Sequence, residues 1–186
     1  MQKTLRPTTK DAIIEAAFDV FSRDQSAPLS AIADRAGVGR ATLHRHFASR
    51  EELIRDLAFI AIEEMDAAAE AAFKGAASYA DAFRNMLKAL IPLGNRHGFL
   101  AKEPLENDEE IAVAFARQQR DTRDIVETAK GEGMFDPNIP TDWITQVFDH
   151  LLYAAWESVK SGEATQSQAA DLAWRTFISG LGGPKI

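Results

Sequence analysis

The chain has 186 residues, of which 46% are hydrophobic, so it can bury one medium core or a small domain joined to a larger one. It contains no cysteine, which excludes disulfides and thiolate metal sites. No apolar run reaches membrane-spanning length and the first residues lack the apolar core of a signal peptide, so we expect a cytoplasmic protein.

The net charge of −7 is unevenly distributed along the chain. Residues 1–55 hold nine Lys and Arg against seven Asp and Glu, whereas residues 56–186 hold twelve against twenty-one. Between Asp34 and Glu51 there is no acid, and this stretch contains four arginines and two histidines. A charge run is often only a solvated face, but this local excess of positive charge also favours contact with phosphates.

A flexible arm is expected over residues 1–7, where Lys3 and Arg6 could contact phosphate or a minor groove, or could simply be disordered. Thr8 or Thr9 is placed to cap a first helix. Its apolar stripe at helical spacing consists of Ile14, Ala17, Phe18 and Phe21. We expect this helix to pack across the next two and complete a three-helix unit.

Residues 29–48 predict two short helices joined by a glycine turn. Ile32 and Ala33 lie on one face of the first helix, and Gly37 supplies the left-handed conformation that the turn needs. From the second helix, Leu43 and then Phe47 face inward. The remaining side chains point elsewhere: Arg40, Ala41, Thr42, His44, Arg45 and His46. A short helix with this outward chemistry suits the major groove of DNA.

The segment AIADRAGVGRATLHRHFASREEL resembles the DNA-binding signature of TetR-type transcriptional regulators, and the likeness covers roughly residues 8–55. The resemblance implies a repressor that binds a palindromic DNA operator as a homodimer and has a ligand pocket in its C-terminal domain. It also implies roles for residues of the second helix. Arg40, Ala41 and Thr42 would face base edges, with Arg40 on a guanine, while His44, Arg45, His46 and Arg50 complete the DNA-binding set, mainly at phosphates. Two positions depart from the family pattern: Gly39 replaces the usual Ser or Thr cap, and His44 replaces the usual Tyr.

A long helix should begin after Ser49, which together with Glu52 forms a capping-box pattern. An apolar stripe continues from Ile54 to Ala72, so this helix is expected to link the DNA-binding part to the body of the protein. We therefore predict a helix-turn-helix DNA-binding domain over residues 1–53 and a ligand-binding and dimerisation domain over residues 54–186.

Further helices are predicted in the second domain, giving an all-α fold of about nine helices. They start near Ser78, Asp108, Thr141 and Ser167, and the last ends near Leu181. Residues 92–108 mix Gly, Pro and charge and predict an irregular or broken helix with Phe99 facing inward, and residues 131–140 predict a loop.

The last two helices carry apolar side chains on more than one face. A C-terminal helix pair with this much apolar circumference is poorly placed to be enclosed within one chain. We therefore expect it to form a homodimer interface with Trp174, Phe177 and Ile178.

Aromatic and methionine side chains in the middle of the chain predict an apolar pocket, for which the candidates are Met86, Phe115 and Trp156. Taken singly, each of these residues is more readily explained as core than as a ligand contact, so the prediction rests on the set. The scarcity of basic residues in this part disfavours a highly anionic ligand, so the expected effector is a small apolar molecule.

No nucleophile with a base, phosphate-binding loop or metal-ligand spacing is present, so we predict no catalytic residue, no metal and no cofactor. Two alternatives remain open. One is an activator or adaptor that binds DNA without a ligand, and the other is a small helical enzyme in which the helix-turn-helix is only structural.

Overall fold

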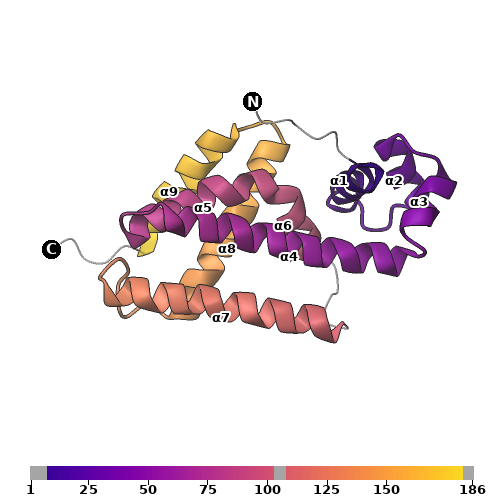
Figure 1. Cartoon of the computed structure of the whole chain (residues 1–186). Helices are drawn as coiled ribbons and strands as arrows, with labels where there is room; N and C mark the ends of the chain where they lie inside the picture. The colour runs from indigo at the N-terminus through magenta and orange to yellow at the C-terminus, as the bar shows by residue number, and fades with distance from the viewer. Residues whose placement is uncertain (1–7, 103–107, 182–186) are drawn as a thin grey trace, which may run out of the picture. The chain divides into compact units, whose positions relative to one another are not determined.

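The computed structural model of the chain describes residues 8–102 and 108–181. Over these residues the chain forms nine α-helices and one short 3-10 helix, with no strand (Figure 1). The elements are α1 (Thr9–Phe21), α2 (Leu29–Ala36), α3 (Arg40–His46), α4 (Arg50–Lys74), α5 (Tyr79–Leu90), η1 (Ile91–Leu93), α6 (Gly94–Leu100), α7 (Glu109–Gly131), α8 (Thr141–Lys160) and α9 (Gln166–Leu181). The predicted all-α fold is confirmed. Among these described helices, none combines the length and the apolar character that crossing a membrane requires.

Two compact units make up the chain. Unit 1 is formed by Met1–Ala61 and Asn95–Ile111, and unit 2 by Ile62–Gly94 and Ala112–Ile186. The boundary therefore falls inside α4, later than the predicted boundary after residue 53, and unit 1 also takes in α6. The predicted arm residues Lys3 and Arg6 lie outside the described residues.

Helix α1 begins as its sequence predicts. Thr8 is the N-cap, and its hydroxyl accepts from the backbone N–H of Asp11 at 3.2 Å while the Asp11 carboxylate accepts from the Thr8 N–H at 2.9 Å. This reciprocal pair is a capping box, and it lowers the pKa of Asp11. The buried face of the helix includes Ile14, Ala17, Phe18 and Phe21.

The core of unit 1 explains why α6 belongs to it. Phe99 of α6 is fully buried, with its ring centroid 5.6 Å from that of Phe18 and 6.3 Å from that of Phe21. The neighbouring Arg96 is 7% exposed, bonds Glu15 of α1 and lies 4.4 Å above the Phe18 ring. Residues far apart in the sequence thus form one aromatic core, which helical periodicity alone could not predict.

The turn between α2 and α3 requires a glycine. Gly37 has φ 68° and ψ 30°, a left-handed conformation that L-residues with a side chain rarely adopt. The N–H of Val38 bonds the carbonyl of Ala33 at 3.0 Å, which closes the end of α2 and directs the chain into α3. Leu43 and Phe47 then hold α3 against the core, because both are buried.

Helix α4 starts with the predicted serine cap. The Ser49 hydroxyl accepts from the N–H of Glu52 at 3.1 Å. The Glu52 carboxylate reaches back one residue further than in a standard capping box and accepts from the N–H of Ala48 at 2.8 Å. The start of this helix is therefore fixed directly after α3.

A cluster of phenylalanines forms the core of unit 2. The ring centroid of Phe83 lies 5.5 Å from those of Phe135 and Phe148 and 5.6 Å from that of Phe177. Phe177 is completely buried in this cluster. It therefore packs within the chain, and the structure removes it from the predicted dimer interface.

The predicted break after α5 is present as η1 and the start of α6. Gly94 is required there, because a Cβ at this position would overlap the indole ring of Trp156. Trp156 is 8% exposed, and Lys160 lies 4.7 Å above its ring. Its indole thus fills the space beside Gly94.

Candidate nucleic-acid interface and ligand pocket

The predicted DNA-contacting residues of the second short helix lie together on α3. Arg40, Ala41, His44 and Arg45 are exposed, while Thr42 and His46 are half-buried at the edges of the same face. The opposite face is closed by Leu43, which is 1% exposed. The fold therefore presents these six side chains as one surface, with no acidic residue on the helix.

The arginines of α3 have no counter-ion among the described residues. Within the described residues, the side chains of Arg40 and Arg45 form no ion pair or hydrogen bond, and neither do those of His44 and His46. Because no carboxylate neutralises these groups, their field is directed into solvent, where it attracts polyanions such as DNA.

The two flanking arginines behave differently. Arg35 pairs with Asp19 at 2.6 Å. The Arg50 guanidinium donates to the carbonyl of Ala27 at 2.7 Å and to that of Gln25, and it lies 4.5 Å above the Phe21 ring. Arg50 thus holds the loop between α1 and α2. Its predicted phosphate contact stays a prediction, and it would have to compete with these bonds.

The departure at Gly39 changes how α3 begins. Gly39 is the N-cap in an extended conformation, and no side chain caps the helix. Its carbonyl still accepts from the N–H of Thr42 at 2.9 Å. The first amide groups of α3 are therefore left without a side-chain acceptor.

Unit 2 contains a cavity of about 1030 Å³ between α4, α5, α7 and α8. Two of the three predicted pocket residues, Met86 and Phe115, line it. The third, Trp156, does not, because its indole packs beside Gly94 instead. The other apolar lining side chains are Met65, Ala69, Phe73, Leu90, Ala116, Ile125, Phe148 and Leu152.

Carboxylates outnumber cations around this cavity. The lining includes two arginines, Arg120 and Arg123, against five carboxylates, which are Asp66, Glu70, Asp121, Asp142 and Asp149. The hydrogen bond from Lys74 lowers the pKa of Glu70 and favours its ionised form. An apolar cavity lined by more carboxylates than cations disfavours anions.

Ion pairs fasten the walls of the cavity to one another. Asp66 of α4 accepts from Arg117 Nη2 and from Gln118 Nε2 of α7, each at 2.7 Å. Arg123 of α7 bonds Asp142 of α8. These pairs could not be predicted from the sequence, since their members lie 51 and 19 residues apart and no local spacing connects them.

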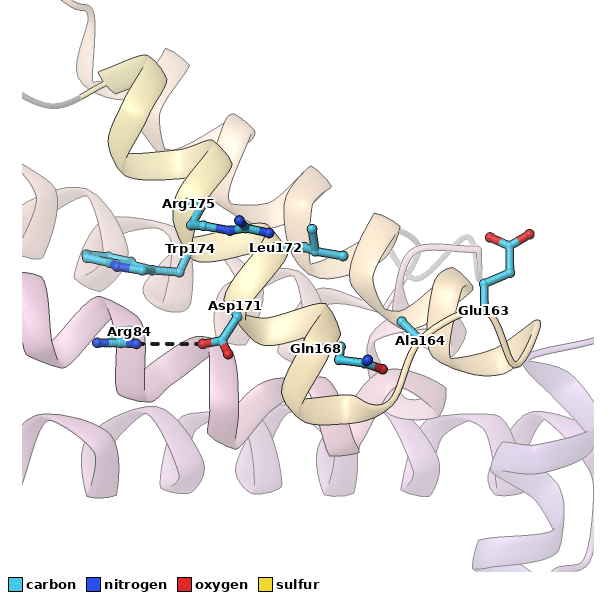
Figure 2. A pocket seen from close by; sticks show the side chains of 8 residues that line it. All are labelled: Arg84, Glu163, Ala164, Gln168, Asp171, Leu172, Trp174 and Arg175. Atoms are coloured by element: carbon cyan, nitrogen blue, oxygen red, sulfur yellow. Dashed lines mark ion pairs between the residues drawn. The ribbon is translucent and has the colours of Figure 1, made fainter.

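A second hollow of about 600 Å³ lies along α9. Figure 2 shows Arg84 of α5 directed at Asp171 of α9, and their ion pair measures 3.7 Å. The other residues that line this hollow are Glu163, Ala164, Gln168, Leu172, Trp174 and Arg175. This hollow is smaller and holds one aromatic side chain, so it is less suited to an aromatic ligand than the cavity between α4, α5, α7 and α8.

Helices α8 and α9 also leave large apolar side chains in solvent. Trp143 is 59% exposed and Leu172 is 50% exposed. The predicted interface residues Trp174 and Ile178 are half-buried. Trp143 and Leu172 were not among the predicted interface residues, because periodicity identifies an apolar residue without showing which side of a helix pair remains uncovered.

The chain matches known proteins along most of its length. Residues 13–57 match the model of the family described as bacterial regulatory proteins, tetR family. The HTH-type transcriptional repressor LfrR of Mycolicibacterium smegmatis is 31% identical over 177 residues, which cover 95% of this chain and 92% of the relative. The chain therefore belongs to the TetR family and is a transcriptional regulator with a helix-turn-helix DNA-binding domain, not an enzyme.

Solved structures agree with this assignment. The crystal structure of LfrR from Mycobacterium smegmatis in complex with proflavine is 30% identical, with a TM-score of 0.76 over 92% of this chain and 95% of that chain. The ketosteroid transcriptional regulator KstR2 of Mycobacterium tuberculosis is 17% identical, with a TM-score of 0.76 over 97% of this chain and 98% of that chain. At that lower identity the second likeness concerns the fold alone.

Proposed function

We propose that this protein is a repressor that binds a palindromic operator as a homodimer and is released from it by a small aromatic cation. In this proposal the two copies of α3 enter successive major grooves on one face of the DNA, about one helical turn or ~34 Å apart. The protein would act in the cytoplasm, where the operator is accessible.

The proposed DNA contacts follow from the exposed face of α3. Arg40 forks onto guanine O6 and N7, Ala41 allows close approach to the base edges, and Thr42 meets a thymine methyl or a phosphate. His44, Arg45 and His46 contact phosphates. The absence of internal partners for Arg40, Arg45 and the two histidines, within the described residues, supports this assignment.

The observation that carries the effector assignment is the combination of aromatic walls and five carboxylates in one cavity. The sequence alone favoured an apolar molecule, and the lining adds a positive charge to that expectation. Proflavine, with which LfrR was crystallised, is a planar aromatic cation, so its chemistry matches this lining. We therefore take proflavine as the probe for this site.

A second copy of the chain is the proposed partner of α8 and α9. Trp143 is 59% exposed and Leu172 is 50% exposed, while Trp174 and Ile178 are half-buried. Apolar side chains therefore remain in solvent, and a two-fold contact between two copies would cover them. Phe177 has no part in this proposal, since it is buried within unit 2.

The test uses the full-length protein and begins with selection of its binding site from random DNA. The selected operator, fluorescently labelled, is then titrated with protein in the presence and absence of proflavine. We expect a palindromic site and a loss of operator affinity of roughly 5–150-fold when proflavine saturates the protein. By linkage, operator must weaken proflavine binding by the same factor.

Because planar cations also insert between DNA bases, an unrelated repressor on its own operator serves as the control at the same proflavine concentration. A protein that binds proflavine without any change in operator affinity would favour the alternative of a DNA-binding regulator whose second domain only dimerises. Transcription in vitro from a template carrying the operator separates a repressor, which lowers transcript yield, from an activator, which raises it.

A further inference from the structure

Asp66 occupies a special place among the carboxylates of the cavity. It lies on α4, lines the cavity, and has both carboxylate oxygens engaged by neighbouring residues of α7. Oδ2 accepts from Arg117 and Oδ1 accepts from Gln118, each at 2.7 Å. A carboxylate that could hold the positive charge of a ligand is therefore already occupied by a side chain of the protein itself.

The ion pair between Asp66 and Arg117 is exposed enough for a ligand cation to take the place of Arg117. The side chain of Arg117 is 57% exposed and that of Asp66 is 34% exposed. Ion pairs at this level of exposure contribute little net stability, because water solvates the separated charges well. Arg117 can thus turn into solvent at small cost. A cation held against the aromatic walls of the cavity is attracted to Asp66 more strongly, because less water lies between the two charges to screen them.

We propose that Arg117 is a stand-in for the effector's positive charge, and that an aromatic cation displaces it from Asp66 and so removes one of the bonds that hold α4 to α7. The inference rests on the proposed function and deepens it by naming the residue that recognises charge and the contact that responds. Helix α4 is the relevant element because it begins directly after α3, with its start fixed by Ser49. A change in the bonds that hold α4 therefore acts on the helix that directly follows the DNA-binding helix α3.

The other lining carboxylates do not offer the same connection. Glu70 is also on α4, but its partner is Lys74 of the same helix, at 2.8 Å, so its exchange separates no two elements. Asp142 pairs with Arg123 and joins α7 to α8 without involving α4. These two pairs provide matched controls. Glu70 can lose the same negative charge as Asp66, and Arg123 can lose the same positive charge as Arg117, and both control residues line the cavity.

The first experiment compares Asp66→Asn with Glu70→Gln by titration of the full-length protein with proflavine and with acridone, a planar aromatic of similar size without a charge. We expect Asp66→Asn to weaken proflavine binding roughly tenfold, the size of one charge-assisted hydrogen bond. Acridone binding should stay within about twofold, since it needs no counter-ion. Glu70→Gln should change proflavine binding by less than about threefold, because Glu70 is exposed and keeps Lys74 beside it.

The second experiment compares Arg117→Gln with Arg123→Gln. Removal of the internal competitor should strengthen proflavine binding about threefold, the effect of one weak ion pair. It should also weaken operator binding in the absence of proflavine, because α4 has lost one of its bonds to α7. Arg123→Gln removes an equal charge but should leave ligand-free operator affinity unchanged, since its pair does not involve α4.

Thermal unfolding of all four variants checks that each is folded. Equal proflavine affinity in the wild type and Asp66→Asn would overturn the inference while leaving the proposed effector class intact. Arg117→Gln with unchanged proflavine and operator affinities would overturn it as well. A wild-type protein that does not bind proflavine would instead overturn the proposed effector class, and the inference with it.

Discussion

Helices α3 and α9 each bury one face in their own unit, but α3 leaves mainly basic and imidazole side chains in solvent, whereas α9 leaves apolar side chains there among charged and polar ones. On α3 the exposed residues include Arg40, His44 and Arg45, and within the described chain none has an internal partner. On α9, Leu172 is half exposed and Ile178 half-buried, both apolar. The exposed face of α3 therefore favours an anion, whereas the apolar side chains of α9 favour an apolar partner.

The comparison shows how to separate residues that serve the fold from those left for a partner. Arginines near α3 that serve the fold are already bonded, as Arg35 is to Asp19 and Arg50 is to the loop before α2. Similarly, Phe177 is buried on α9 while Ile178, the next residue, is not. Residue type alone would give the bonded arginines the same role as the unbonded ones on α3, and Phe177 the same role as Ile178.

The largest effect is expected from a charge in the apolar face of α9. Ile178→Glu should convert the dimer into monomers in sedimentation, because an unpaired carboxylate in an apolar interface loses its hydration, at a cost of several kcal/mol. Monomers should also bind the palindromic operator far more weakly.

Phe177→Leu is the matched control on the same helix. It should lower the free energy of unfolding by roughly 1 kcal/mol, since it changes the shape of a packed core, and should leave the dimer intact. A folded Ile178→Glu protein that sediments as an unchanged dimer would place the interface elsewhere.

The next effect concerns the exposed face of α3. Arg40→Ala should cost roughly 1–3 kcal/mol of operator affinity, mainly at one base pair of each half-site, and relax the preference there. The melting temperature should not change, because Arg40 contributes no internal contact within the described residues. Selection from random DNA measures the preference directly, and an unaltered site would refute base readout by Arg40.

Substitution of Arg50 should have a smaller effect than that of Arg40, and the effect should be on stability and not on operator affinity. If its guanidinium stays on the carbonyls of Ala27 and Gln25, Arg50→Ala should lower the free energy of unfolding by about 1 kcal/mol and leave the salt dependence of operator binding unchanged. Arg45→Ala should do the reverse, reducing the salt slope by about 1 without loss of stability. A reduced slope for Arg50→Ala would instead support the phosphate contact predicted from the sequence.

The smallest effect is a pH dependence at the start of α7. Hydrogen bonds from Arg55 and from the N–H of Ile111 lower the pKa of Asp108 below its ordinary value of 3.8. Because the folded-state pKa is depressed, the stabilisation is present above that ordinary value and is lost as pH falls through the lowered one. Urea unfolding from about pH 5 downward should therefore show a steeper loss for the wild type than for Asp108→Asn. Parallel profiles would contradict this assignment.

Local patterns were sufficient to predict most helix positions. Thr8, Gly37 and Ser49 act within a few residues of themselves, so their caps and turns could be found from spacing. The clustering of the α3 residues followed for the same reason, because one short helix carries all of them.

Contacts between distant segments could not be predicted in this way. Phe99 packs on α1, and Trp156 fills the space beside Gly94 instead of lining the cavity. Apolar periodicity marks both as inward-facing without naming the neighbour. The exchange partner of Asp66 was hidden for the same reason, since Arg117 lies on another helix.

The close fit of Gly94 against Trp156 has a consequence for anyone who wishes to repack the interior of this protein. The two positions form a coupled pair, since any side chain at 94 would collide with the indole at 156. A library that varies position 94 alone would return glycine or misfolded chains. Varying both positions together, with a smaller residue at 156, opens combinations that single substitutions cannot reach.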